Sequence, residues 1–264
     1  MKRFLVTLSL GLALWFWSIG SATAVSQDRL DEVTQQWQGS LHAVSEVNCS
    51  SCHQDKETKD LISKPTYESC QTCHESETET FLLGKHGIRL QEGLSPLTPA
   101  MARIPMHPDA RDTVMNCNTC HDVHAVNTHT AAVDACTTCH DDAHTRNYPN
   151  SPHADLFANA GELPRPDTAS VTCATCHLPR QTLGETDVVF VNHNNTYTLL
   201  PRDRMVKDVC MNCHGLEHSY NSIFDDALVE ANFDHPPSQK LESFDLVRAF
   251  EKRRSGGNEP PASE

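Results

Sequence analysis

The chain has 264 residues and a formal net charge of −14 at pH 7. A protein this acidic is excluded as a binder of nucleic acid through the phosphate backbone. Hydrophobic residues make up 38% and aromatic residues 6% of the chain. Ordinary globular domains have roughly 45–50% apolar residues, glycine included, so these side chains cannot build a large core by themselves.

The first 24 residues predict an export signal. Lys2 and Arg3 precede an apolar run over residues 4–20, and Ala22-Thr23-Ala24 offers small side chains to a signal peptidase. We expect cleavage after Ala24 and a periplasmic or extracellular protein. The alternative is an uncleaved anchor, because the run approaches the ~20 residues that span a bilayer. Residues 25–254 are predicted to form one domain, and residues 255–264 a disordered tail.

All twelve cysteines lie in six CxxCH motifs. A disulfide framework gives no reason for a histidine after every second cysteine, and a zinc site would gather its ligands at wider cysteine-to-histidine separations. A thioredoxin-like motif would occur once, within a βαβ unit. Covalent haem attachment uses all three residues, because two thiols bind the porphyrin and the histidine binds its iron. We therefore predict six covalently bound haem c groups, which would also supply the missing apolar interior.

The predicted attachment residues follow from the motifs, numbered first to sixth in chain order. The thioether cysteines are Cys49 and Cys52, Cys70 and Cys73, Cys117 and Cys120, Cys136 and Cys139, Cys173 and Cys176, and Cys210 and Cys213. The iron ligands within the motifs, here called the motif histidines, are His53, His74, His121, His140, His177 and His214.

The remaining elements are predicted in chain order. We expect helices over residues 28–37, around each motif, over 223–232 and over 241–254. Seven glycines and prolines between residues 81 and 116 favour an extended loop there. Residues 188–193 and 196–200 suggest a short hairpin around Asn194-Asn195. The apolar residues of the last helix predict a cover over a haem, or alternatively a contact between subunits.

Ten further histidines are available for the second axial position of the irons. Imidazole is a strong ligand there and favours low-spin haem. Our predicted distal ligands are His42, His86, His107, His144, His153 and His193. Three histidines, His124, His144 and His218, follow a motif histidine by three or four residues, which places them on the same helical face. They therefore cannot reach the far side of their own haem. They either ligate a neighbouring haem or pack beside it, and the spacing leaves both open.

Longer stretches carry a family resemblance. Residues 116–157, NCNTCHDVHAVNTHTAAVDACTTCHDDAHTRNYPNSPHADLF, resemble the haem-binding core of the superfamily of hydroxylamine oxidoreductases and ammonia-forming cytochrome c nitrite reductases. The similarity covers roughly residues 70–235 and includes GKHG, SPH, CHLPR and VNHN. It implies stacked haem pairs joined into one chain. The eight or five haems usual in that superfamily and the CxxCK motif of its nitrite reductases are not matched here.

The resulting fold class is mostly α with long irregular loops and little β, a compact multihaem cytochrome built around a stacked haem array. The favoured function is electron transfer through bis-histidine haems between redox proteins. Its acidic surface suits a basic docking patch or a membrane quinol-linked cytochrome, and a homo-oligomer is possible. The alternative is a nitrite or hydroxylamine oxidoreductase with one five-coordinate haem, at the first or second motif. The sequence assigns no catalytic residue.

Overall fold

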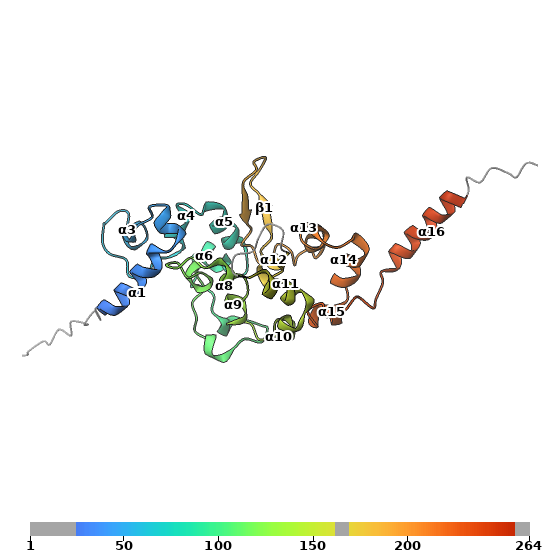
Figure 1. Cartoon of the computed structure of the whole chain (residues 1–264), viewed down its shortest axis with the longest axis horizontal. Coiled ribbons are helices and arrows are strands. Elements are labelled where there is room, and N and C mark those ends of the chain that lie inside the picture. Colours follow the sequence, from blue (N-terminus) through green and yellow to red (C-terminus); the bar gives the residue numbers. More distant parts are fainter. Residues whose placement is uncertain (1–24, 162–168, 257–264) are drawn as a thin grey trace, which may run out of the picture.

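The computed structural model describes residues 25–161 and 169–256. The predicted export signal therefore lies outside the described residues. The molecule is elongated, with α1 (Gln27–Gln38) at one end and α16 (Glu242–Gly256) projecting from the other (Figure 1). Within the two described ranges, no helix is both long and apolar enough to cross a membrane.

Short helices joined by irregular segments make up most of the body. From the amino-terminal end they are α2 (Leu41–Val44), α3 (Cys49–His53), α4 (Tyr67–Gln71), α5 (Glu75–Leu83), α6 (Ile88–Gln91), η1 (Pro99–Met101), η2 (Pro108–Ala110), α7 (Cys117–Cys120), α8 (Thr128–Ala132), α9 (Asp134–Thr137) and α10 (Ala143–Asn147). They continue with η3 (Tyr148–Asn150), α11 (Pro152–Ala160), α12 (Cys173–His177), α13 (Asp203–Asp208), η4 (Cys210–Asn212), α14 (Leu216–Ile223) and α15 (Asp226–Glu230). The predicted mostly helical class with loops and little strand is confirmed.

A two-stranded antiparallel sheet stands out from the body (Figure 1). Strand β1 (Arg180–Thr182) pairs with β2 (Val189–Val191), with Gln181 opposite Phe190. The predicted hairpin was wrong in its second strand. Gly184, at a φ of 58°, lies in the turn that leads β1 back into β2, and the main chain over residues 194–200 forms tight turns instead of a strand. The apolar run over residues 188–191 indicated a strand but not which neighbour pairs with it.

The hydrophobic core is small, as the composition requires. Its main cluster consists of Met205, Val206 and Ile223, with partly buried neighbours that include Cys176 and Cys210 of the fifth and sixth motifs. Because motif cysteines contribute to the apolar core, the places where haem attaches and where the polypeptide packs coincide in this part of the molecule.

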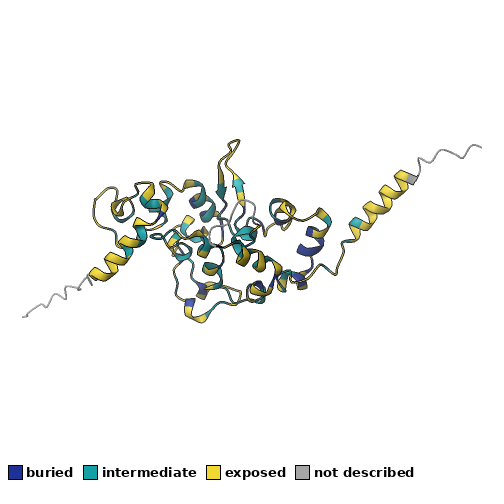
Figure 2. Cartoon of the chain, in the orientation of Figure 1, coloured by how far each residue is buried: buried dark blue, intermediate teal, exposed yellow. Residues whose placement is uncertain are grey.

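Two predicted segments differ from their expected structure. The stretch over residues 81–116 is not a continuous loop, because it contains the end of α5, all of α6 and the turns η1 and η2. Helix α16 forms where predicted and extends to Gly256, but it does not cover the body (Figure 2). Leu246 and Phe250 are 67% and 56% exposed. It is anchored to α14 by Phe244, whose ring centre lies 6.1 Å from that of Tyr220, and by an ion pair between Arg248 and Glu217.

Leu228 tests the importance of this small core. Its side chain is 1% exposed, so replacing it with alanine should lower the free energy of unfolding by about 2–5 kcal/mol through lost burial and a cavity. The measurement is guanidinium unfolding of the haem-loaded protein followed by far-ultraviolet circular dichroism. Leu246→Ala, at an exposed site on α16, is the matched control and should change stability by less than about 0.5 kcal/mol. Equal unfolding midpoints for the two variants would contradict the prediction.

Candidate metal centres

Each CxxCH motif lies at a short helical turn, and polar residues before several motifs explain where those turns begin. Asn48, Asn116 and Thr172 immediately precede the first cysteine of the first, third and fifth motifs and act as N-caps. Asn116 and Thr172 form full capping boxes with Thr119 and Thr175. Capping satisfies backbone N–H groups that the helix itself cannot pair, so the turn starts at the cysteine. The two thiols and the histidine of a motif are thereby held within one helical turn.

Every motif histidine faces a second histidine from another part of the chain. The six pairs are His53 with His124, His74 with His42, His121 with His193, His140 with His86, His177 with His144, and His214 with His153. The distances between ring centres lie between 6.0 Å and 6.3 Å in all six pairs. Such uniformity, in pairs drawn from unrelated loops and helices, indicates one common constraint.

This spacing fits an iron ion between two imidazoles. Metal–imidazole bonds of roughly 2.0–2.1 Å on opposite sides of one ion place the ring centres about 6 Å apart. Directly stacked rings would be closer, as the 4.7 Å between His214 and His218 shows. The residues at each CxxCH motif therefore fit a haem, which the two cysteines would attach and the facing pair of histidines would ligate.

Backbone carbonyls orient four of the paired imidazoles. The Nδ1 atom of His53 lies 2.8 Å from the carbonyl of Ile62, and that of His193 lies 2.7 Å from the carbonyl of Val191. Two further paired histidines share the arrangement: the Nδ1 atom of His42 is hydrogen-bonded to the carbonyl of Val123, and that of His144 to the carbonyl of Val229. A carbonyl can only accept, so Nδ1 carries the proton and Nε2 keeps its lone pair for a metal.

Burial keeps the central histidines neutral. It lowers the pKa of His86 to about 4 and the pKa of His177 to about 4, and nearby imidazoles act in the same direction. Burial likewise lowers the pKa of His121. A neutral imidazole is the form that binds iron, so these sites need not lose a proton to do so near neutral pH.

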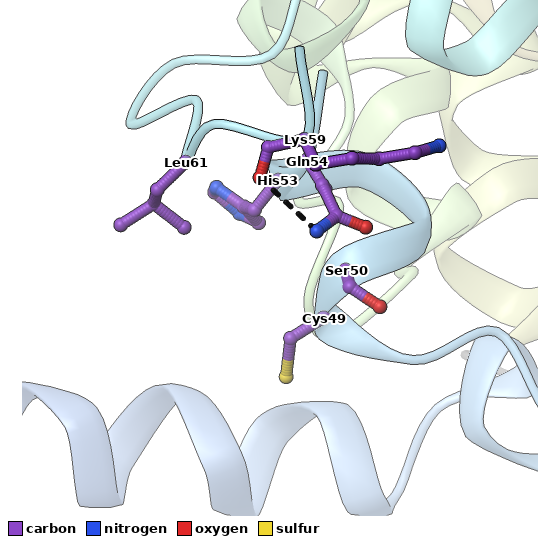
Figure 3. Close-up of a pocket in the computed structure, with 6 residues that line it drawn as sticks. All are labelled: Cys49, Ser50, His53, Gln54, Lys59 and Leu61. Carbon is purple, nitrogen blue, oxygen red and sulfur yellow. Dashed lines mark hydrogen bonds between the residues drawn. The ribbon is translucent and has the colours of Figure 1, made fainter. Parts of the chain in front are cut away.

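The first motif lies beside a hollow in the surface. An open hollow of about 220 Å³ is lined by Cys49, Ser50, His53, Gln54, Lys59 and Leu61. The ring of His53, at the end of α3, and the side chain of Leu61 both line this hollow, and Gln54 donates a hydrogen bond to the Lys59 carbonyl (Figure 3). Because the hollow contains both a motif cysteine and a motif histidine, it belongs to the first haem site.

Cysteines of consecutive motifs lie close enough to influence one another. Cys117 lies within hydrogen-bonding reach of Cys70 and raises its pKa, and Cys173 does the same to Cys136. Burial raises the pKa of Cys120 with a contribution from Cys139, and burial raises that of Cys176 to about 12 with a contribution from Cys210. Burial also raises the pKa of Cys52, followed by the effects of Cys70 and Cys73. The attachment sites are thus neighbours in chain order, from the first motif to the sixth.

The structure places five of the six predicted distal ligands opposite a motif histidine. These are His42, His86, His144, His153 and His193. His107 differs, because no motif histidine of the described chain pairs with it and His140 of the fourth motif faces His86 instead. The backbone explains the difference: the His107 N–H donates to the Cys139 carbonyl at 2.9 Å, and Met106 bridges to His140. The backbone of His107 is therefore held beside the fourth motif itself, and not on the opposite side of that site where a distal ligand would lie.

His124, which was not among the six predicted distal ligands, faces the remaining motif histidine. It follows the third motif histidine by three residues and faces His53 of the first motif. The spacing showed that His124 could not serve its own haem, but it did not show which distant motif the loop would approach. His144 likewise faces the histidine of a motif other than the one it follows, His177 of the fifth motif. His218, the third member of that class, instead stacks against His214.

A comparison with protein-family models agrees with the motifs. Residues 41–141 match the family model of cytochrome c3. Among solved structures, a chain of the reducing HAO-like protein complex of Kuenenia stuttgartiensis is similar, with 18% sequence identity, a TM-score of 0.49, and 84% of this chain covered. The present chain spans 60% of that solved chain. A search of curated proteins found no match.

The protein class follows from the motifs, the paired histidines and the family match. The chain is a multihaem c-type cytochrome, and haem c is its covalently bound cofactor. Over residues 41–141 its similarity is specifically to cytochrome c3, the part that contains the first four motifs.

Two alanine variants separate His124 from His107. His124→Ala should leave the first motif without its opposing imidazole, so about one haem in six becomes high-spin or takes up an added ligand. His107→Ala should leave every haem low-spin. Electron paramagnetic resonance (EPR) of the oxidised protein measures both. A high-spin signal in His107→Ala together with an unchanged spectrum in His124→Ala would contradict the observed pairing.

The ring planes make a second spectroscopic prediction. The His53 and His124 planes are nearly parallel, at 5°, whereas the other five pairs are inclined by 43–84°. Parallel axial imidazoles split the iron d orbitals most strongly and give a rhombic low-spin signal, while steeply crossed planes give signals with a large maximal g value. We expect the most rhombic component of the oxidised spectrum, of about one haem, to come from the first site, because the His86–His140 and His121–His193 planes are inclined by 43° and 46° and those of the remaining pairs by more. Its absence, with all haems low-spin, would contradict the geometry of the first site.

Proposed function

We propose that the protein is an exported hexahaem cytochrome that transfers electrons between redox proteins through a chain of bis-histidine haems. The observation that carries this proposal is the set of six imidazole pairs with ring centres 6.0–6.3 Å apart, one for each CxxCH motif. Haem supplies reversible one-electron chemistry at iron, tuned by its axial ligands and surroundings. The residues of the chain hold both axial positions and leave no motif histidine without an opposing imidazole in the described ranges.

The order of the motifs gives the proposed path. The first and second motifs lie with α3 and α4 toward one end of the molecule, and the sixth lies with η4 and α14 toward the other (Figure 1). The neighbouring cysteines connect each motif to the next along this length. Electrons would therefore enter at one end and leave at the other, and the first and sixth sites would be the places of exchange.

Exposure at the two ends supports this assignment. Cys49 of the first motif, Cys73 of the second and Cys213 of the sixth are exposed, whereas the cysteines of the third, fourth and fifth motifs are half-buried or buried. A partner can approach an exposed site closely, and close approach is what electron exchange requires. The third, fourth and fifth sites are more shielded and would serve as relays.

Export and partner type are part of the proposal. Residues 1–24 have the pattern of a secretion signal, and covalent multihaem attachment is compatible with a periplasmic or extracellular location. The net charge of −14 favours a partner with a basic docking patch, such as a redox protein or a membrane quinol-linked cytochrome. A second copy of this chain, in a homo-oligomer, is the alternative partner in this proposal.

An enzymatic role would require an open distal position. The first and second motifs were the favoured places for such a haem, yet their histidines face His124 and His42. A nitrite or hydroxylamine oxidoreductase of this chain would have to displace one of these imidazoles before substrate could bind iron. The pairing therefore favours the electron carrier.

Ligand binding and mass provide the test. The oxidised protein should show only low-spin ferric haem by EPR, unchanged by nitrite, cyanide or hydroxylamine at concentrations that saturate five-coordinate haems. Intact mass should equal a chain that starts at Val25 plus six haem groups. A high-spin signal that converts on adding nitrite would overturn the carrier in favour of the enzyme. A mass with fewer haem increments would overturn the hexahaem count.

A further inference from the structure

The loop that follows the third motif joins three haem sites within four residues. His121 is the motif histidine of the third site, the carbonyl of Val123 accepts from His42 of the second site, and His124 faces His53 of the first site. No other segment of the described chain contributes to three sites over so short a length. A small change in this loop would therefore reach three neighbouring redox centres.

Asp122 shapes this loop. Its Oδ1 atom accepts hydrogen bonds from the backbone N–H of His124 at 3.0 Å and from that of Ala125 at 3.1 Å. Its own carbonyl accepts from the N–H of Val126 at 2.7 Å. A side-chain oxygen that binds the N–H two residues on closes a tight turn, which aspartate and asparagine form most readily.

The turn ends at a residue with an unfavourable backbone conformation. Val126 has a φ of 56°, in the left-handed region that a β-branched residue rarely adopts. Such a conformation costs of order 1–3 kcal/mol and persists where surrounding contacts impose it. The hydrogen bonds of Asp122 are the contacts that close the chain at this point.

We propose that Asp122 is a positioning residue that sets His124 as the distal ligand of the first haem and, through Val123, orients His42 at the second. This inference rests on the proposed bis-histidine function. Asp122 does not bind iron; its carboxylate fixes the main chain from which the His124 ring reaches toward His53. Without the turn, the 6.3 Å spacing and the 5° inclination of the two rings would not be maintained.

The same device occurs after the fourth motif. Asp142 accepts from the N–H of Thr145 at 3.1 Å and caps helix α10. That helix carries His144, which faces His177 of the fifth site. In both places, an aspartate lies one or two residues after a motif histidine and turns the chain. The next histidine therefore faces the histidine of another motif instead of lying at its own.

Three variants of Asp122 test the proposal in the haem-loaded protein. Asp122→Ala removes the acceptor oxygen and should abolish the rhombic EPR component assigned to the first haem, with a high-spin signal of about one haem in six. Asp122→Asn keeps an oxygen at the same place and should retain the wild-type spectrum. Asp122→Glu keeps the charge but displaces the oxygen by one methylene, so it should behave like the alanine variant.

Asn127→Ala is the matched control. Asn127 accepts from the N–H of His129 and of Thr130 at 3.0 Å and 3.1 Å, so its turn has the same form and also precedes a histidine. His129 stacks on Phe157 and faces no motif histidine of the described chain. The control variant should therefore lose a turn of equal strength and keep all haems low-spin.

The outcomes separate this inference from the proposed function. Wild-type protein with a high-spin haem would overturn the bis-histidine function itself. Low-spin wild type with an unchanged Asp122→Ala spectrum would overturn only the role of Asp122. A wild-type spectrum in Asp122→Glu, with loss in Asp122→Asn, would show that charge and not the turn acts, and would overturn the proposal. If Asp122→Ala carries fewer than six haems by intact mass, the comparison of Asp122→Glu with Asp122→Asn tests the proposal in its place.

Discussion

The nearly constant separation of six facing imidazole pairs, which fits one iron between the two rings of each pair, is the constraint on which the rest of the structure depends. Six pairs have nearly the same ring-centre distance, although their members come from α2, α10, α11, β-turn segments and irregular loops. An ordinary core tolerates changes of packing as long as volume is preserved. A bis-histidine site allows far less, because each bond has a fixed length. The short helices and many turns are consistent with a chain whose path is set by these twelve rings.

This constraint also explains the weak polypeptide core. Few large apolar side chains are fully buried, and those in the main cluster pack against cysteines of the fifth and sixth motifs. In such a chain, folding and haem ligation would be coupled in the same way as folding and metal binding in other metal-dependent domains. Hydrogen bonds from Nδ1 to backbone carbonyls strengthen the coupling, because they connect the orientation of a ligand ring to the main chain of a distant segment.

The sequence predicts the motif residues better than it predicts their partners. Covalent attachment is local, so Cys136, Cys139 and His140 can be recognised within five residues. A distal ligand depends on where a remote loop arrives, which no local spacing records. His107 looked suitable because it precedes the third motif, but its backbone pairs with Cys139, and His124 faces the first motif instead. For the same reason, the strand at β2 was predicted and its partner β1 was not.

The loop from His121 to Val126 shows why electron transfer and local geometry cannot be separated in this protein. Consecutive residues there serve the first, second and third sites, so a hydrogen bond to one histidine lies within a few bonds of another site. Axial-ligand orientation and hydrogen bonding both influence haem potential. A tight turn that fixes several ligands at once therefore links the potentials of neighbouring haems through the polypeptide. Such a link would keep the relative order of those potentials while the surrounding surface adapts to different partners.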